Sequence, residues 1–240
     1  MGPEKKEKRM QQWKIPETVN IRKLLSLMEA RRTVRGYKLD PVPDGAIEQI
    51  LEAARLAPCG ANQQPWQFVV VREPGTRKKL VEALADGLEV DRRQEEFRPV
   101  GYRHLNPRKP YCSHAPVFIV VCGDPRTQEA YPLAYHRDWI FIESLAAATM
   151  SIHLAATALG LGTMWQSVTP YMETQIKAIL DIPEPYVIPN VAPIGYPKTV
   201  VGEKDAKSLE EIFHWDRYDR SRFLDNLKFH EHSRIHFEHL

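Results

Sequence analysis

Three short apolar runs constrain the fold more than any other feature of this chain. They are rich in β-branched residues, are bounded by turn-forming residues, and span 66–71, 117–122 and 187–194. Runs of this length and composition are typical of strands buried on both faces. Pro189 and Pro193 place the third run at a sheet edge or at a bulge, because proline lacks the N–H that a ladder needs. The pattern predicts a core of buried strands.

Apolar residues with helical spacing fill most of the sequence between these runs. Helices are expected at five places: from Ile21 to the arginines near 31, from an N-cap at Asp44 to Pro58, from Pro74 onward, over 137–159, and over 172–180. The helix over 137–159 is rich in alanine and is expected to be central and buried on several faces. A further strand is expected over 163–167 and a helical turn over 209–215. These elements predict helices and strands in alternation.

The bulk composition is that of one globular domain. The chain has 240 residues, of which 43% are hydrophobic and 27% charged, with a net charge of +2. So small a charge implies no long-range attraction to nucleic acid or to a membrane surface. No apolar run approaches the ~18–20 residues that span a bilayer, and residues 1–14 lack the apolar core of a secretory signal. Three cysteines without a pair fit a reducing compartment, so we expect a cytoplasmic protein.

Three segments differ in character from the core. Residues 1–18 are charged and are expected to form a flexible arm, and 19–215 form the folded domain. Residues 216–240 form a C-terminal extension whose apolar residues would pack on a partner subunit. The charged stretch 87–114 is either a lid or a solvated excursion. The histidines after 229 match no metal-site spacing, so no metal is expected.

Arg31, Arg32, Thr33 and Arg35 group three guanidiniums and a hydroxyl within five residues. Basic residues at a helix C-terminus complement the helix dipole, which accounts for one or two of them. In an extended segment Arg31, Thr33 and Arg35 project to one side, where they can bind a phosphate and a carbonyl-rich ring edge. By itself this segment is explained equally well by ligand binding and by helix capping.

The segment 57–66, Ala-Pro-Cys-Gly-Ala-Asn-Gln-Gln-Pro-Trp, is rich in amides and small side chains. Gly60 permits backbone geometry closed to other residues, and the amides offer donors and acceptors to the polar edge of a ring. Proline, glycine and asparagine also mark ordinary connections, so the combination with residues 31–35 carries the argument. Cys59 is interpreted as a small space-filling residue. Together the two segments predict a site for flavin mononucleotide (FMN).

Residues 31–35 and 57–71 resemble the nitroreductase family of FMN-dependent oxidoreductases. The segments 159–163, 193–197 and 208–212 match the family in the same order, so the resemblance covers about residues 22–215. It implies an α+β fold with a mixed, mainly antiparallel central sheet flanked by helices. It also implies an intertwined homodimer with FMN at the interface.

The resemblance assigns a role to each motif residue. Arg31 and Thr33 would hold the phosphate and ribityl chain with Arg32 beside them, and Arg35 would lie near the pyrimidine edge. A cation there stabilises the negative charge that develops on reduction. The partner subunit would supply a loop made of Pro58, Cys59, Gly60 and Asn62, with Gln64 in support. A third segment would pass the ring with an amide or hydroxyl near the flavin N5: Trp165, Gln166 and Ser167.

The chain departs from the family pattern at two places. Ala206 stands where members commonly carry an arginine that contacts the phosphate, and Lys204 or Lys207 could replace it as a point charge without the bidentate fork. Residues 165–169 are bulkier than the glycine-rich run of many members. Bulkier groups over the flavin could narrow the substrate range or change the mode of electron transfer.

The expected reaction is ping-pong transfer of hydride from NADH or NADPH through FMN to an electron-poor small molecule such as a nitroaromatic or a quinone. The flavin carries the chemistry and no catalytic side chain is required. Relatives with this fold also dehalogenate aromatics, oxidise heterocycles or cleave the flavin, and a hydroxyl such as Ser167 near N5 would favour one-electron steps. A flavin-binding protein without turnover is a further alternative, which the altered position 206 allows.

Overall fold

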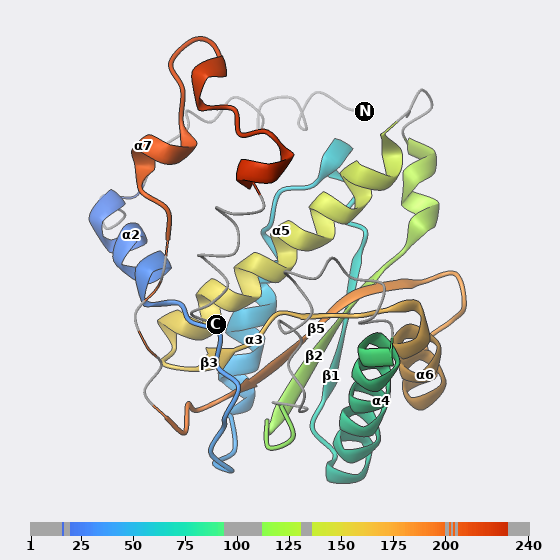
Figure 1. Cartoon of the computed structure of the whole chain (residues 1–240). Coiled ribbons are helices and arrows are strands. Elements are labelled where there is room, and N and C mark those ends of the chain that lie inside the picture. The colour runs from blue at the N-terminus through green and yellow to red at the C-terminus, as the bar shows by residue number, and fades with distance from the viewer. Residues whose placement is uncertain are drawn as a thin grey trace, which may run out of the picture.

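The computed structural model describes residues 16, 20–93, 112–130, 136–199, 202, 204 and 206–229. This part of the chain forms a central antiparallel sheet with helices packed against both faces (Figure 1). The flexible arm expected over 1–18 and the last residues of the expected extension lie almost entirely outside the described residues. The α+β architecture predicted from the sequence is confirmed.

The three apolar runs form the long strands of the sheet. They are β1 (Trp66–Val71), β2 (Val117–Gly123) and β5 (Val187–Gly195), in the order β1-β2-β5-β3, with β3 (Gly162–Thr163) beside β5. The short strand β4 (Gln166–Ser167) also pairs with β5, so the single strand expected over 163–167 is in fact two. All these pairs are antiparallel.

The placement of β5 decides between the two positions that its prolines allowed. Its prolines predicted an edge or a bulge, yet β5 is bordered by β2 on one side and by β3 and β4 on the other. The bulge is present: the β2–β5 register shifts between Val121 and Gly123, in the part of β5 that contains Pro189. Pro193 lies opposite Phe118 within the ladder. The short partners β3 and β4 leave gaps in the ladder where a missing N–H does little harm.

The side chains of β2 show how the layers are arranged. Phe118 and Val120 belong to one apolar cluster with residues of α4 (Pro74–Arg93) and α6 (Pro170–Leu180). Ile119 and Val121 belong to a second cluster with residues of α3 (Asp44–Arg55) and α5 (Arg137–Ala158). Successive strand residues point to opposite faces, so β2 is buried on both sides.

The helices follow the predicted pattern with two corrections. α2 (Ile21–Ala30) ends at the arginines as expected, and α7 (Leu209–Ile212) begins with a capping box between Ser208 and Glu211. Asp44 is the first residue of α3 and not its N-cap, which is Pro43. α4 continues to Arg93, so the first residues of the expected 87–114 connection are helical. Residues 94–111 lie outside the described part.

Helix α5 forms the centre of the second cluster. By length and composition it could cross a membrane, although the apolar runs of the sequence predicted no such segment. Leu145, Ala148 and Ile152 are fully buried, and α5 packs on α3 and on the sheet. Its small residues allow that close packing, as predicted, and its apolar character reflects a place in the core.

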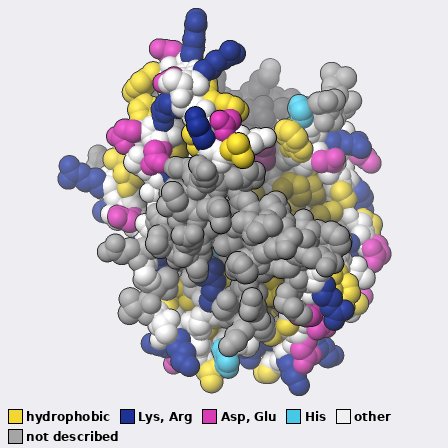
Figure 2. Space-filling model, in the orientation of Figure 1, with side chains coloured by type: hydrophobic (Ala, Val, Ile, Leu, Met, Phe, Trp, Pro, Cys, Tyr) yellow, Lys and Arg dark blue, Asp and Glu magenta, His cyan; other side chains and the backbone are white. Residues whose placement is uncertain are grey.

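Two regions keep apolar side chains at the surface. Along α2, Ile21, Leu24, Leu25 and Met28 are all exposed. The C-terminal segment, defined here as residues 209–229, exposes eight large apolar side chains: Leu209, Ile212, Trp215, Tyr218, Phe223, Leu224, Leu227 and Phe229. Figure 2 shows hydrophobic side chains on the surface of the region around α7, at the upper left of the view. Apolar surface of this extent is typical of interaction sites.

Candidate functional site

The arginine segment is fastened to the sheet directly after α2. Thr33 forms a parallel bridge with Thr163 of β3, and the Val34 N–H donates to the Thr163 carbonyl at 2.8 Å. Val34 is buried against Gly162, where an added Cβ would lie 2.5 Å from the Val34 Cγ2. The absence of a side chain at residue 162 therefore lets the segment dock closely against β3.

The side chains of this segment have different environments. Arg32 is held by backbone carbonyls: its Nε donates to Gly202 at 3.0 Å, and its Nη1 donates to Arg31 at 3.1 Å and also to Glu29. Arg31 lies near enough to His153 of α5 to act on its charge. Arg35 is exposed, whereas Arg31 and Thr33 are half-buried. Arg32 is thus a fixed cation that ties α2 to residue 202.

The loop at 58–64 packs on a different part of α5. The Gly60 N–H donates to the Ser144 hydroxyl at 3.2 Å, and the Gln64 N–H donates to the Cys59 sulfur at 3.2 Å. The predicted left-handed geometry is present, but not at Gly60: the positive φ values belong to Ala61 (45°), Asn62 (55°) and Gln64 (47°). Non-glycine residues in this region are uncommon and occur mainly at tight turns and at functional sites.

The two motifs contact different parts of α5. Thr163, which anchors the arginine segment, contacts His153, whereas the 58–64 loop contacts Ser144. Nine residues of α5 separate these contacts, which is about 13 Å along a helix. The motifs therefore lie at different heights on the same helix.

The segment past β3 offers an open aromatic face. Trp165 is 42% exposed and stacks on His153, with ring centroids 5.6 Å apart. Gln166 and Ser167 follow in β4, opposite Val191 and Asn190 of β5. Ser167 is at the same time exposed, so its hydroxyl is accessible. All three predicted residues are thus adjacent to the strand that holds the arginine segment.

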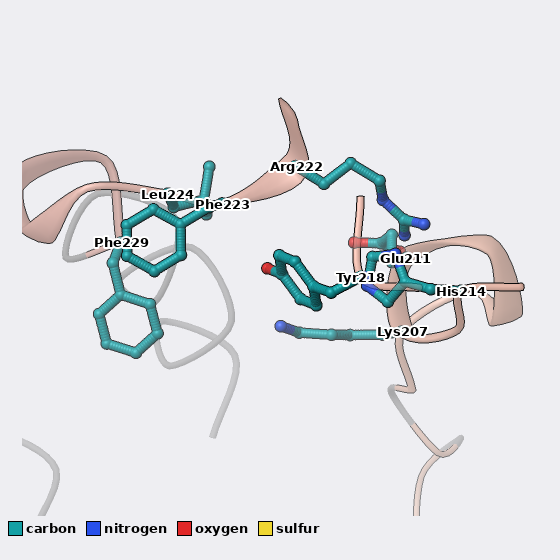
Figure 3. A pocket seen from close by; sticks show the side chains of 8 residues that line it. All are labelled: Lys207, Glu211, His214, Tyr218, Arg222, Phe223, Leu224 and Phe229. Carbon is teal, nitrogen blue, oxygen red and sulfur yellow. The ribbon is translucent and has the colours of Figure 1, made fainter. Parts of the chain in front are cut away.

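The structure separates the two lysines proposed to replace the family arginine. Lys204 lines an open hollow of about 680 Å³ together with Arg32, Ala206 and three residues of α2: Leu25, Met28 and Glu29. Lys207 lines another pocket, of about 410 Å³, in the C-terminal segment, where it lies alongside Tyr218 (Figure 3). Lys204 is therefore the lysine beside the arginine segment.

Other reactive groups are withdrawn from solvent. Burial raises the pKa of Cys112 to about 11 and that of Cys122 to about 12, so both remain thiols at neutral pH. Within the described residues no group of histidine, cysteine and carboxylate side chains could hold a metal. The histidines after 229 lie outside this part. His153 was not predicted as a site residue. The one signal for it in the sequence is a polar side chain at a core position of an apolar helix.

Known proteins resemble the chain over most of its length. The sequence profile of the Nitroreductase family matches residues 28–196. A protein of Archaeoglobus fulgidus, provisionally named an NADH dehydrogenase/NAD(P)H nitroreductase, is 34% identical over 201 residues, covering 83% of this chain and 98% of that protein. The iodotyrosine deiodinase of Haliscomenobacter hydrossis is 29% identical over 180 residues, covering 71% of this chain and 77% of that protein.

A solved structure supports the fold. The NADPH:FMN oxidoreductase of Vibrio harveyi, complexed with NAD+, superposes with a TM-score of 0.66 at 19% identity, covering 90% of this chain and 84% of that one. The family profile spans well over half of the chain and contains both the arginine segment and the 58–64 loop. The chain therefore belongs to the nitroreductase family and is an oxidoreductase.

Proposed function

We propose that this protein binds FMN between two copies of the chain and transfers reducing equivalents from NADH or NADPH to an electron-poor small molecule. The observation that carries the proposal is the docking of the Arg31–Arg35 segment on β3, beside the open ring of Trp165 and the hollow shared by Arg32 and Lys204. Cations next to an aromatic face suit a flat ligand with a phosphate.

The residues present fit a flavin phosphate. Arg31 and Thr33 would bind the phosphate and the ribityl chain, and Lys204 would supply the charge that is missing at Ala206. Arg32, already bonded to three carbonyl oxygens, would hold the segment in place and add positive potential. These separate roles account for the hydrogen bonds of Arg32 to backbone carbonyls and for the exposure of Arg35.

Arg35 would tune the cofactor. When bound, FMN would supply the redox chemistry between the nicotinamide and the acceptor. A guanidinium at the pyrimidine edge favours the reduced, negatively charged state because it is in place before the charge develops. The exposed face of Trp165 would exclude water from one side of the site. The side chains therefore bind and orient, and no side-chain acid or base is required.

The partner subunit would complete the site. The 58–64 loop contacts Ser144, about 13 Å along α5 from His153, which supports the anchor of the arginine segment. We assign the loop at each flavin to the second copy, as the family resemblance implies. The exposed apolar residues of α2 and of the C-terminal segment would be covered in the same dimer. Three free cysteines, two of them buried, suit the reducing cytoplasm as its location.

The test is direct. Freshly purified protein is expected to be yellow, to contain FMN in a 1:1 ratio to chain, and to oxidise NADH or NADPH with a quinone or nitroaromatic acceptor. Anaerobic titration with each nicotinamide identifies the donor. A colourless monomer that does not bind added FMN contradicts the proposal, and bound FMN without turnover would identify a flavin-binding protein instead.

A second reaction has an observation in its favour. Ser167 exposes its hydroxyl on β4, next to Trp165, and a hydroxyl near the flavin N5 would favour one-electron transfer. The similarity to an iodotyrosine deiodinase is in line with reductive dehalogenation, and the equal identity of 29% to a 5,6-dimethylbenzimidazole synthase of Rhodospirillum rubrum keeps heterocycle oxidation and flavin cleavage as the alternatives. A reductive titration that passes through a one-electron stage supports this reaction. Direct passage to the fully reduced cofactor, unchanged in Ser167→Ala, contradicts it.

A further inference from the structure

A buried histidine lies beneath the proposed cofactor site. His153, in the second half of α5, is 2% exposed, and its Nε2 finds no hydrogen-bond partner among the described residues. A buried polar atom without a partner costs free energy, and such atoms are rare in folded proteins. An aliphatic residue would fill this position of an apolar helix without that cost. The histidine therefore requires an explanation in terms of its contacts.

Its contacts lead toward the site. The Nδ1 atom shares a short hydrogen bond with the Thr163 hydroxyl, and the ring stacks on Trp165 with an interplanar angle of 23°. The backbone of Thr163 in turn holds Val34 and forms a bridge with Thr33. His153 thus touches Thr163, which anchors the arginine segment, and Trp165, which follows Thr163 by two residues.

The charge state of His153 suits this role. Burial, and after it the nearby Arg31 guanidinium, lower the pKa of His153 to about 4, so the ring is neutral near pH 7. In either neutral tautomer, Nδ1 and the Thr163 hydroxyl form one hydrogen bond, because a hydroxyl can both donate and accept. One bond and one stacked face then fix the plane of the ring.

We infer that His153 is a positioning residue that sets the plane of the Trp165 ring, so that the outer face of Trp165 forms a wall for a flat aromatic ligand. Trp165 is held from below by His153 and is 42% exposed on its remaining surface. The flat ligand is either the flavin or the aromatic acceptor, which share this chemistry. The inference rests on the proposed function, because it assigns a role within that site.

The experiment compares His153→Leu, Trp165→Phe and the double variant. The fluorescence of Trp165 is obtained by subtracting the spectrum of Trp165→Phe from that of the protein that retains Trp165. His153→Leu is expected to change this difference spectrum in the apoprotein. His153→Leu is also expected to raise, about tenfold, either the Kd for FMN or the KM for a quinone, with kcat within about twofold. In the Trp165→Phe background the same substitution should have no such effect.

Further variants separate positioning from folding. His153→Phe keeps a flat ring and should restore part of the binding, whereas Thr163→Val removes only the hydrogen bond and should loosen the stack. His136→Leu is the matched control, because His136 stacks on Trp139 at the other end of α5, with centroids 4.9 Å apart. It should leave the Kd and the KM unchanged.

The outcomes are distinct. A raised Kd for FMN places the flavin on Trp165, and a raised KM alone places the acceptor there. If His153→Leu lowers stability but leaves Trp165 emission, Kd and KM unchanged, His153 is only a core residue and the inference is overturned. If the wild-type protein binds no FMN, the proposed function fails, while the emission of Trp165 still shows whether His153 positions that ring.

Discussion

The core of the sheet and the surface of α2 with the C-terminal segment are both rich in apolar residues, but only the first is buried. Every residue of β2 is buried, with helices on both sides. In contrast, none of the residues of α2, all of which lie in the described part, is buried. The comparison indicates that one chain can bury the side chains of its sheet but not the apolar side chains of α2 and the C-terminal segment. We attribute that surface to the proposed dimer.

The largest expected effect breaks the core. Phe118→Ala should lower the free energy of unfolding by about 3–5 kcal/mol, because Phe118 is fully buried. The matched change Phe223→Ala, at a residue 68% exposed in the C-terminal segment, should cost under about 1 kcal/mol in the monomer. Urea unfolding at low protein concentration measures both. Equal losses at the two sites would contradict the contrast between the regions.

An acid titration tests the buried region through His153 of α5. Its pKa is about 4 in the folded chain and near 6.5 when unfolded, so the folded state favours the neutral ring. Above pH 6.5 the ring is neutral in both states. As the pH falls from 6.5 toward 4, protonation of the unfolded chain lowers the free energy of unfolding by on the order of 3 kcal/mol. Unfolding measured across this range should show a steeper decline for wild type than for His153→Leu. Parallel curves would contradict the assignment.

A charge placed on α2 tests the uncovered surface. Leu24→Glu, at a residue 41% exposed, should raise the dimer dissociation constant by about thirtyfold, or ~2 kcal/mol, while monomer stability changes by less than about 0.5 kcal/mol. Leu39→Glu, at an isolated side chain 76% exposed, is the control and should not affect association. Sedimentation equilibrium measures the constants. An unchanged dimer in Leu24→Glu would show that α2 is not part of the interface.

The smallest effect concerns the two lysines. Lys204→Ala should raise the Kd for FMN about fivefold, or ~1 kcal/mol, because Lys204 shares the hollow with Arg32. Lys207→Ala should have no effect, because Lys207 lies in the C-terminal pocket. The effect of Lys204→Ala should shrink as salt is added. The reverse order of effects would place the phosphate in the C-terminal pocket.

Much of this could be predicted because local patterns decide it. The three apolar runs became the long strands, and the five expected helices are present, since hydrophobic periodicity and proline positions act over a few residues. The central position of β5 could not be predicted, because pairing partners are set by the whole sheet. The stacking of His153 on Trp165 could not be predicted either, since tertiary structure brings the two rings together.

The spacing along α5 has a genetic consequence. If each cofactor uses the arginine segment of one copy and the 58–64 loop of the other, damage to the two motifs is not equivalent. A copy altered at Arg35 and a copy altered at Gly60 can combine into a mixed dimer in which one cofactor site has both defects and the other has none. Two individually inactive alleles would then complement each other.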